Sequence, residues 1–147
     1  MIARRLKSYL EVLPAIAAVL SAEKWGVRIR PGPIPQGMPL PYVKLTADGG
    51  NPDYHLGGEI GDLAKRVQVD VWAETEKEAD DIAELIRLAP LSGYFGTWTD
   101  LEGNTTHVKA VTIQSEIDTF EDPKDGSDEM RYRNTKVYRI HFDRSVN

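Results

Sequence analysis

Three histidines, His55, His107 and His141, are the side chains of this chain best suited to hold a metal ion or to move a proton. None of them has a second histidine or a cysteine three or four residues away, the spacing that places two ligands on one helix face. The sequence contains no cysteine, which excludes thiolate ligands, thiol nucleophiles and disulfides. We therefore expect no metal site and no cofactor, and we expect each histidine to lie in a loop or at a solvent-facing position.

Two pairs of adjacent carboxylates, Asp80-Asp81 and Glu121-Asp122, have the residue type needed for general acid and base catalysis. Neighbouring residues point in different directions, so a solvated helix face and a solvated turn are the favoured interpretations. Asp70 differs because it lies in an alternating run beside Trp72. It falls on the face opposite the valines of that run, which predicts an exposed or interface carboxylate.

Neither a phosphate-binding loop nor a nucleic-acid surface is well supported. The glycine-rich residues 48–62 lack the Lys-Ser/Thr ending of a P-loop, and no helix is expected directly after them. Arginine and tyrosine alternate over residues 131–133, as they do on single-strand-binding surfaces, but an ordinary half-exposed strand has the same pattern. The formal net charge of -5 and the pI near 5.2 disfavour broad nucleic-acid binding, because phosphate affinity comes from clustered lysine and arginine.

The elements that would position these groups begin with an amphipathic helical segment. Apolar residues recur at three- and four-residue steps from Ile2 to Leu20, which favours a helix over the uniformly apolar core of a secretory signal. Pro14 lacks an N–H and fits a first helical position, so we expect one helix near 2–12 and another near 14–22. No stretch approaches the roughly 20 apolar residues of a membrane span.

The next segments alternate short strands with turn-rich connections. Residues 27–30 are expected to form an edge strand, and residues 31–41 hold five of the nine prolines, which predicts a stiff, extended strap. Residues 41–46 are expected to form a strand. The glycine-rich residues 47–63 predict a long loop, which would be either a mobile tip or a partner-binding element.

The clearest pattern covers residues 66–88, where the apolar period changes from that of a strand to that of a helix. The core face of the strand is expected to contain Val67, Val69, Val71 and Ala73. Thr75 and Glu78 form a capping box that starts the helix, and Pro90 ends it. The buried stripe of the helix is expected to contain Ala79, Ile82, Ala83, Ile86 and Ala89.

The last part of the chain predicts a loop followed by two paired strands. Residues 91–105 carry several glycines together with Tyr94 and Trp98, and are expected to form the loop. Residues 108–120 and 132–142 are expected to pair as long strands, the first with a bulge. Residues 116–129, which include the connection between the strands, hold seven acids against one base.

Together these segments predict one domain, residues 1–147, of the α+β class. Its sheet is expected to be mainly antiparallel with four to five strands, on which the N-terminal helix and the second amphipathic helix pack. A chain of this size buries roughly two thirds of its unfolded surface, which suffices for one core.

Two of these segments, in this order and at this spacing, resemble a known family. Residues 35–43 read Pro-Gln-Gly-Met-Pro-Leu-Pro-Tyr-Val, and residues 67–75 read Val-Gln-Val-Asp-Val-Trp-Ala-Glu-Thr and run into the amphipathic helix. The chain resembles the tail completion, or tail terminator, proteins of long-tailed bacteriophages and prophages, closely over residues 2–90 and loosely over the C-terminal strands. The connection between those strands matches no pattern of that family.

The resemblance implies a structural, non-enzymatic protein at the neck end of a virion tail, assembled in the host cytoplasm. Such a subunit would form a ring, typically a homo-hexamer, that ends polymerisation of the tail tube protein and offers a surface to the head-tail connector protein. The resemblance implies no catalytic residue, no cofactor and no membrane partner. DNA would pass through the lumen without specific binding, which an acidic lumen would favour.

The residues that we expect at an interface or in loops facing the lumen combine the acidic connections with the second face of the 66–73 strand. They are Asp48, Asp53, Tyr54, Asp70, Trp72, Glu121, Asp122, Lys124, Asp125 and Asp128. One alternative is another head-tail connector or neck protein. A second is a small cytoplasmic enzyme or ligand-binding α+β protein, which would need a deep pocket with converging polar groups.

Overall fold

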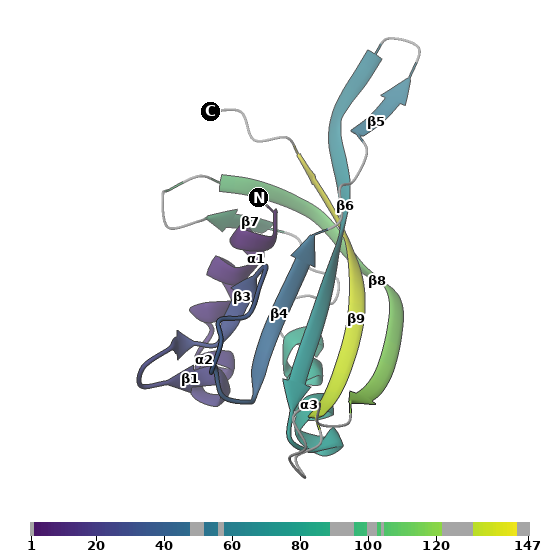
Figure 1. Cartoon of the computed structure of the whole chain (residues 1–147). Helices are drawn as coiled ribbons and strands as arrows, with labels where there is room; N and C mark the ends of the chain where they lie inside the picture. The colour runs from purple at the N-terminus through teal and green to yellow at the C-terminus, as the bar shows by residue number, and fades with distance from the viewer. Residues whose placement is uncertain are drawn as a thin grey trace.

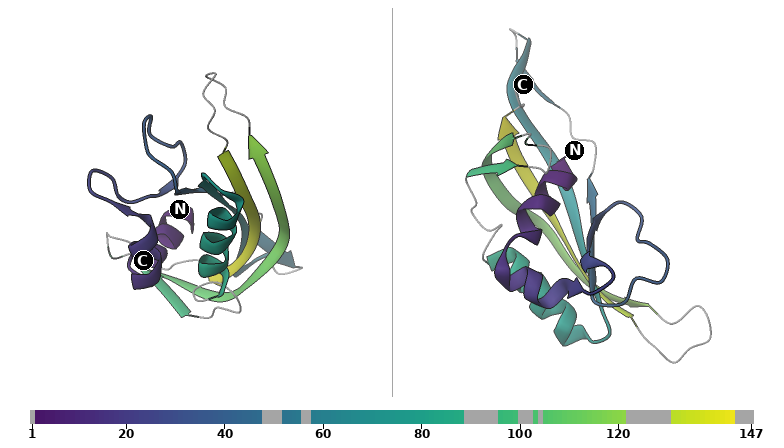
Figure 2. Two further views of the ribbon diagram at one scale, coloured as in Figure 1. Left: turned by 90° about the horizontal axis from the view of Figure 1, so that it is seen from below. Right: turned by 90° about the vertical axis from the view of Figure 1, so that its left-hand side faces the viewer.

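The computed structural model describes residues 2–47, 52–55, 58–88, 96–99, 103, 105–121 and 131–143. These residues form a curled, mainly antiparallel sheet and three helices (Figure 1). Figure 2 shows that the helices lie inside the curve of the sheet. In the described part of the chain no helix packs on the outer, convex face. The predicted α+β class with a mainly antiparallel sheet is confirmed.

Two short helices, α1 (Ile2–Glu11) and α2 (Pro14–Leu20), begin the chain and meet at a corner. A proline begins α2, where the first turn of a helix has no partner for an N–H donor. The apolar stripe of α1 is buried, with Leu6 and Leu10 both 0% exposed. Both predicted helices are present, and each ends within two residues of the position expected from the sequence.

The main sheet has seven strands, six of which follow the order β3-β4-β6-β9-β8-β7, while β5 pairs with β6 off this path. Their bounds are Ile29–Pro31 (β3), Tyr42–Ala47 (β4), Pro52–His55 (β5), Gly58–Ala73 (β6), Gly96–Thr99 (β7), Thr105–Glu121 (β8) and Arg131–Asp143 (β9). β3 runs parallel to β4, and the other pairs are antiparallel. The prediction of four to five strands was therefore too low.

The strand expected over residues 27–30 is divided between two sheets. Val27 belongs to β2 (Gly26–Val27), which pairs with β1 (Ser21–Ala22) in a small ribbon, whereas β3 begins at Ile29. Arg28 between them is buried and holds the chain at this point. Its Nε donates to the carbonyl of Leu20 at 2.9 Å, and its Nη1 donates to the carbonyls of Pro39 and Leu40 at 3.2 and 3.1 Å. These bonds fix the end of the proline-rich strap against α2.

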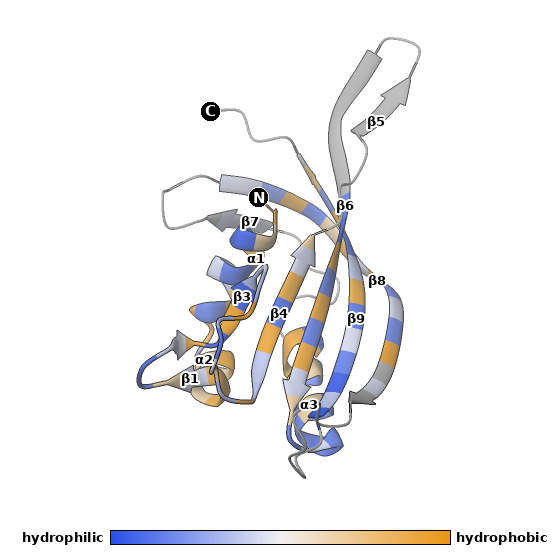
Figure 3. Ribbon diagram, in the orientation of Figure 1, coloured by the Kyte–Doolittle hydropathy of each residue, from blue (hydrophilic) through white to orange (hydrophobic). Residues whose placement is uncertain are grey.

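The joint between β6 and α3 (Glu76–Ile86) matches the sequence pattern. Apolar and polar residues alternate along the described part of β6 (Figure 3). The backbone N–H of Glu78 donates to the hydroxyl of Thr75 at 3.1 Å, which caps the helix. The apolar stripe of α3 is buried as expected at Ala79, Ile82, Ala83 and Ile86. Ala89 and Pro90 lie outside the described residues.

β8 and β9 are the two long strands expected at the C-terminus, and their register shifts twice, between Val108 and Ala110 and between Ile113 and Ser115. Such bulges bend a strand, which suits a sheet that curls around helices. Tyr138, Ile140 and Phe142 share the core face of β9, where they are 0%, 0% and 7% exposed. The bulged strand pair predicted from the sequence is confirmed.

The prediction of one long loop over residues 47–63 was wrong. Residues 52–55 form β5, and β6 already begins at Gly58, so that β5 and β6 make a hairpin that projects beyond the rest of the sheet (Figure 1). Glycine weakens a strand locally, but long-range pairing overrides this preference. Here β6 remains in register with β9, with Leu63 opposite Phe142.

The prediction of a loop over residues 91–105 was also wrong, because residues 96–99 form the edge strand β7. Trp98 is 0% exposed, and its ring stacks on that of Tyr9 in α1 with the centroids 5.5 Å apart. Burying an indole contributes more to stability than the flanking glycines cost. This contact joins the far edge of the sheet to the first helix.

Candidate interaction surface on the convex face of the sheet

The convex face of the sheet is built from one side of four neighbouring strands. In the strand register, Trp72 of β6 lies opposite Tyr42 of β4 on one side and Arg133 of β9 on the other. Arg133 in turn lies opposite Thr119 of β8. We call this surface the uncovered face. Its central part, over residues 42–46, 66–72, 112–119 and 133–141, consists of Tyr42, Lys44, Thr46, Arg66, Gln68, Asp70, Trp72, Thr112, Ser115, Ile117, Thr119, Arg133, Thr135, Val137, Arg139 and His141.

Asp70 lies at the centre of the uncovered face and is only 4% exposed. The Thr135 hydroxyl donates to its Oδ1 at 2.5 Å, and the Gln68 amide donates to its Oδ2 at 2.8 Å. The Nε of Arg133 lies 4.0 Å from Oδ1. The sequence correctly placed Asp70 opposite the valines, but the expectation of an exposed carboxylate was wrong, because side chains from β6 and β9 close over it.

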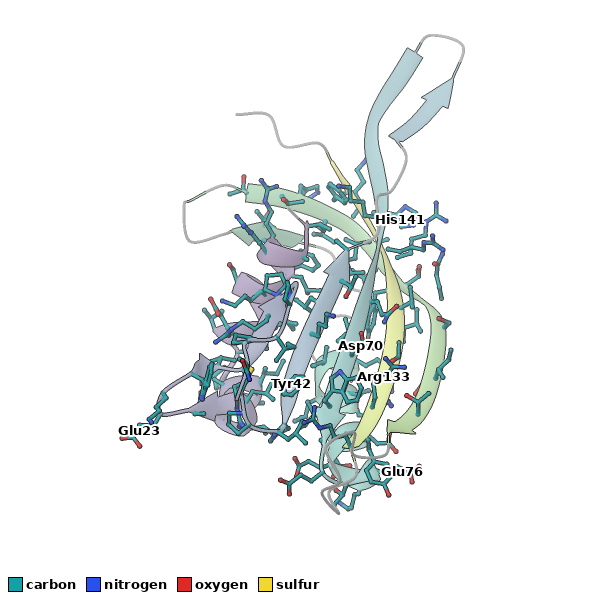
Figure 4. All side chains as sticks on the ribbon, viewed as in Figure 1. Glu23, Tyr42, Asp70, Glu76, Arg133 and His141 are labelled. Carbon is teal, nitrogen blue, oxygen red and sulfur yellow. The ribbon has the colours of Figure 1, made fainter. Side chains whose placement is uncertain are left out.

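Trp72, which is partly exposed, lies between a cation and a second aromatic ring. The guanidinium of Arg133 is 5.1 Å from the centre of the Trp72 ring, within the range of a cation–π interaction. The Tyr42 ring lies on the other side at 6.4 Å and is tilted by 34°. Figure 4 labels Tyr42, Asp70 and Arg133, which lie on the three adjacent strands β4, β6 and β9. The result is an ordered aromatic and polar centre on a face that no described helix covers.

The opposite side of β9 faces α3 and carries a different set of charges. Lys136 is 2% exposed, and its Nζ lies 3.2 Å from Glu84 of α3 and 3.3 Å from Glu116 of β8. The Asn134 amide donates to Asp80 of α3 at 3.0 Å. These contacts fix the helix to the sheet by polar groups as well as by the apolar stripe.

Glu84 also accepts hydrogen bonds from Arg87 at the end of α3, the shortest at 2.7 Å. The hydrogen bonds from Arg87, followed by those from Lys136, lower the pKa of Glu84 to about 2. Burial raises the pKa of the Tyr138 phenol on the same side of the sheet. The chemistry of this region is that of a structural ion network.

Large apolar side chains remain exposed on both surfaces. On the uncovered face Ile117 is 55% exposed. On α3 and the turn after it, Leu85 and Leu88 are 36% and 63% exposed. Single exposed apolar side chains are common on protein surfaces, and Val12 of the α1–α2 turn is exposed as well, so these residues by themselves do not identify an interface.

The structure places the residues that the sequence singled out in three groups. Asp70 and Trp72 lie together on the uncovered face, whereas Asp53 and Tyr54 lie in β5 instead of in the expected loop, and Glu121 ends β8. The remaining residues, Asp48, Asp122, Lys124, Asp125 and Asp128, lie outside the described residues.

Sequence reasoning missed the partners of Asp70 and Trp72, namely Tyr42, Arg133 and Thr135. The alternation of β9 contained a signal for two of them, since it places Arg133 and Thr135 on the face away from the core residues Tyr138 and Ile140. The alternation does not give the strand register, which places these residues beside Asp70 and Trp72 of β6.

The surface offers little to a small ligand or a metal ion. A depression of about 260 Å³ on the uncovered face is lined by Thr46, Ala47, Arg66, Gln68 and Val137, none of which is an acid or a histidine. Within the described ranges, no group of three histidine, aspartate or glutamate residues could hold a metal ion. No helix of the same ranges is long and apolar enough to cross a membrane.

The family model of the tail completion protein gp17 matches residues 4–95, which run from α1 past the end of α3. The chain belongs to this tail completion protein family. It is therefore a structural component of a phage-like virion and not an enzyme. The matched residues include the proline-rich strap, the strand that carries Asp70 and Trp72, and the capped helix α3.

Comparison of structures agrees with this assignment at the level of the fold. This chain superposes on a chain from the structure titled "Virion of native gene transfer agent (GTA) particle" with a TM-score of 0.65 and 13% sequence identity. The match covers 95% of this chain and 92% of the other, so the two share the whole architecture. Comparison with curated protein sequences finds no match.

Proposed function

We propose that this protein caps the tail tube, ends its polymerisation and forms the surface to which the head connector docks. Membership of the tail completion family over residues 4–95 is the observation that carries the proposal. The side chains support it as well, because the uncovered face is ordered, aromatic and charged without presenting an acid and a base to a common substrate.

A ring is the form of assembly that suits this subunit. Closed rings are built from heterologous contacts, in which a patch on one copy meets a different patch on the next copy. The chain offers two such patches, the uncovered face on the convex side of the sheet and the outer surface of α3 on the helical side. We infer a ring of identical subunits, with a hexamer as the expected form.

The β5–β6 hairpin is suited to reach a neighbouring layer of the tail. It projects beyond the rest of the sheet (Figure 1), and β5 pairs with no described strand other than β6. Strand edges of this kind pair readily with other chains. We propose that the hairpin contacts either the last ring of the tail tube protein or the connector.

DNA is proposed to cross the ring without specific binding. The chain carries a net charge of -5, and a lumen lined by some of its acids would repel phosphate. The acids proposed for this lining are Asp48, Asp53, Glu121, Asp122, Asp125 and Asp128. This part of the proposal is tested by reversing these charges. Unchanged assembly and unchanged infectivity of the charge-reversed variant would contradict it.

Tail length in particles that lack the protein tests the capping function. Loss of a protein that ends polymerisation should give overlong tails without heads. Loss of a connector or another neck protein should instead give unattached tails of normal length. The second result would contradict the proposal and would favour a role at the head side of the joint. Return of normal tail length after supply of the protein in trans is the control.

A further inference from the structure

The charges of this acidic protein are divided between the two sides of its sheet. Over residues 42–46, 66–72, 112–119 and 133–141, the central part of the uncovered face carries four cations, Lys44, Arg66, Arg133 and Arg139, and one carboxylate, Asp70. Asp70 is 4% exposed and lies 4.0 Å from the Nε of Arg133, so its charge offsets one of these cations. This central part of the uncovered face is therefore net basic, in contrast to the chain as a whole.

The outer surface of α3 has the opposite charge. Residues 74–87 hold six carboxylates against two cations, Lys77 and Arg87, and four of these carboxylates remain for the outer surface, since Asp80 and Glu84 bond to Asn134 and Lys136 of β9. Each cation is already paired within the helix, Lys77 with Asp81 at 2.7 Å and Arg87 with Glu84 at 2.7 Å. Glu74 and Glu76 at the start of the helix are exposed. This surface is net acidic, and it ends in the exposed Leu85 and Leu88.

The two patches cannot neutralise each other within one copy. α3 packs on β6 and β9 from the helical side, whereas the uncovered face is the other side of the same strands. The sheet therefore lies between them. Each patch also has an apolar part, formed by Trp72 and Ile117 on the uncovered face and by Leu85 and Leu88 on the helix.

From this complementarity we infer that the uncovered face of one copy binds the outer surface of α3 of the next copy around the ring. The inference rests on the proposed ring and specifies which surfaces close it. A symmetric contact would set the basic face against a second basic face, or the acidic helix against a second acidic helix, and like charges across an interface are strongly unfavourable. The head-to-tail contact pairs opposite charges and buries apolar side chains from both copies.

Cysteine cross-linking tests the inference, because the natural chain contains no cysteine to interfere. The double variant Arg139→Cys with Leu85→Cys carries one thiol on each patch. In rings formed at the ends of tail tubes, mild oxidation should join this variant into a ladder of oligomers. Each single variant should stay monomeric after oxidation, since each of its contacts would contain only one thiol. Dimers formed by a single variant would indicate a symmetric contact and would overturn the inference.

Charge reversal provides a test independent of thiol geometry. Arg139→Glu and Glu76→Lys should each reduce the fraction of capped tubes by about tenfold or more, since each creates like charges across the contact. Both changes together should restore capping at least in part. Glu23→Lys, an exposed charge reversal in the turn between β1 and β2 (Figure 4), is the matched control and should cap normally.

The outcomes separate this inference from the proposed function. Normal capping by both single reversals, or capped tubes with no cross-linked ladder, would overturn the inference and leave the capping function intact. Failure of the unmodified protein to cap tubes would contradict the proposed function itself. In a third outcome, the unmodified protein binds duplex DNA, and Arg139→Glu loses this binding but still caps tubes normally. That result would assign the basic face to nucleic acid and would also overturn the inference.

Discussion

Lys136 of β9 donates to Glu84 of α3 at 3.2 Å from a side chain that is only 2% exposed. Its ammonium also lies 3.3 Å from Glu116 of β8, so one buried cation holds a helix and a neighbouring strand through two partly exposed carboxylates. The position of α3, and with it the acidic surface assigned to the ring contact, depends on this arrangement.

Removal of both carboxylates should cost far more stability than removal of either. Glu84→Gln or Glu116→Gln leaves Lys136 one anionic partner, and each change should lower the free energy of unfolding by about 1 kcal/mol or less. The double variant leaves a buried ammonium without a carboxylate, which should cost about 3–5 kcal/mol. Urea unfolding of the four proteins measures the difference, and additive effects would contradict the account.

The pH dependence of stability should contain a contribution from Glu84. Its folded pKa is lowered from 4.5 to about 2, first by the hydrogen bonds from Arg87 and then by Lys136. A lowered carboxylate pKa contributes stability that is present above the unfolded pKa and is lost as the pH falls towards the folded one. Stability should therefore fall between pH 4.5 and about 2, and less steeply in Glu84→Gln. Equal slopes for both proteins would show that Glu84 is not held in this way.

Truncation of the buried carboxylate on the uncovered face should destabilise the isolated subunit. Asp70→Ala leaves the Thr135 hydroxyl and the Gln68 amide without their acceptor, and should cost about 2–3 kcal/mol. Thr135→Val removes one hydrogen bond and should cost about 1 kcal/mol. Thermal unfolding measures both variants. An Asp70→Ala variant as stable as the natural protein would mean that the carboxylate has no structural role.

Trp98 and Trp72 should respond differently to truncation. Trp98 is 0% exposed and stacks on Tyr9, so Trp98→Ala should lower stability by about 3–5 kcal/mol. Trp72 is partly exposed on the uncovered face, so Trp72→Ala should change stability much less while reducing capping of tail tubes. Chemical unfolding and a count of capped tubes measure the two effects. A Trp72→Ala variant that is stable and caps normally would place the ring contact elsewhere.

Much of the fold follows from local patterns in the sequence. The alternation of Val67, Val69 and Val71, the capping box at Thr75 and the proline at position 14 are short-range signals, and the structure confirms the elements that they predict. The two missed strands, β5 and β7, have glycine-rich surroundings that favour loops locally. Each forms because it pairs with another strand, β5 with β6 and β7 with β8. The stacking of Trp98 on Tyr9 also holds β7 in place. A local sequence pattern contains no information about these partners.

The candidate surface was predictable only in part for the same reason. The two-residue period places Asp70 and Trp72 on the face away from the core. It gives no information about the register of β6 on β9, and that register brings the Thr135 hydroxyl to Asp70 and the Arg133 guanidinium over Trp72. The burial of Asp70 is therefore a property of the assembled sheet.

Electron microscopy of tail tubes mixed with the purified protein tests the central claim most directly. The account predicts a ring of added density at one end of each tube and an end to further growth at that end. Bare tube ends and continued growth in the presence of excess folded protein would contradict it.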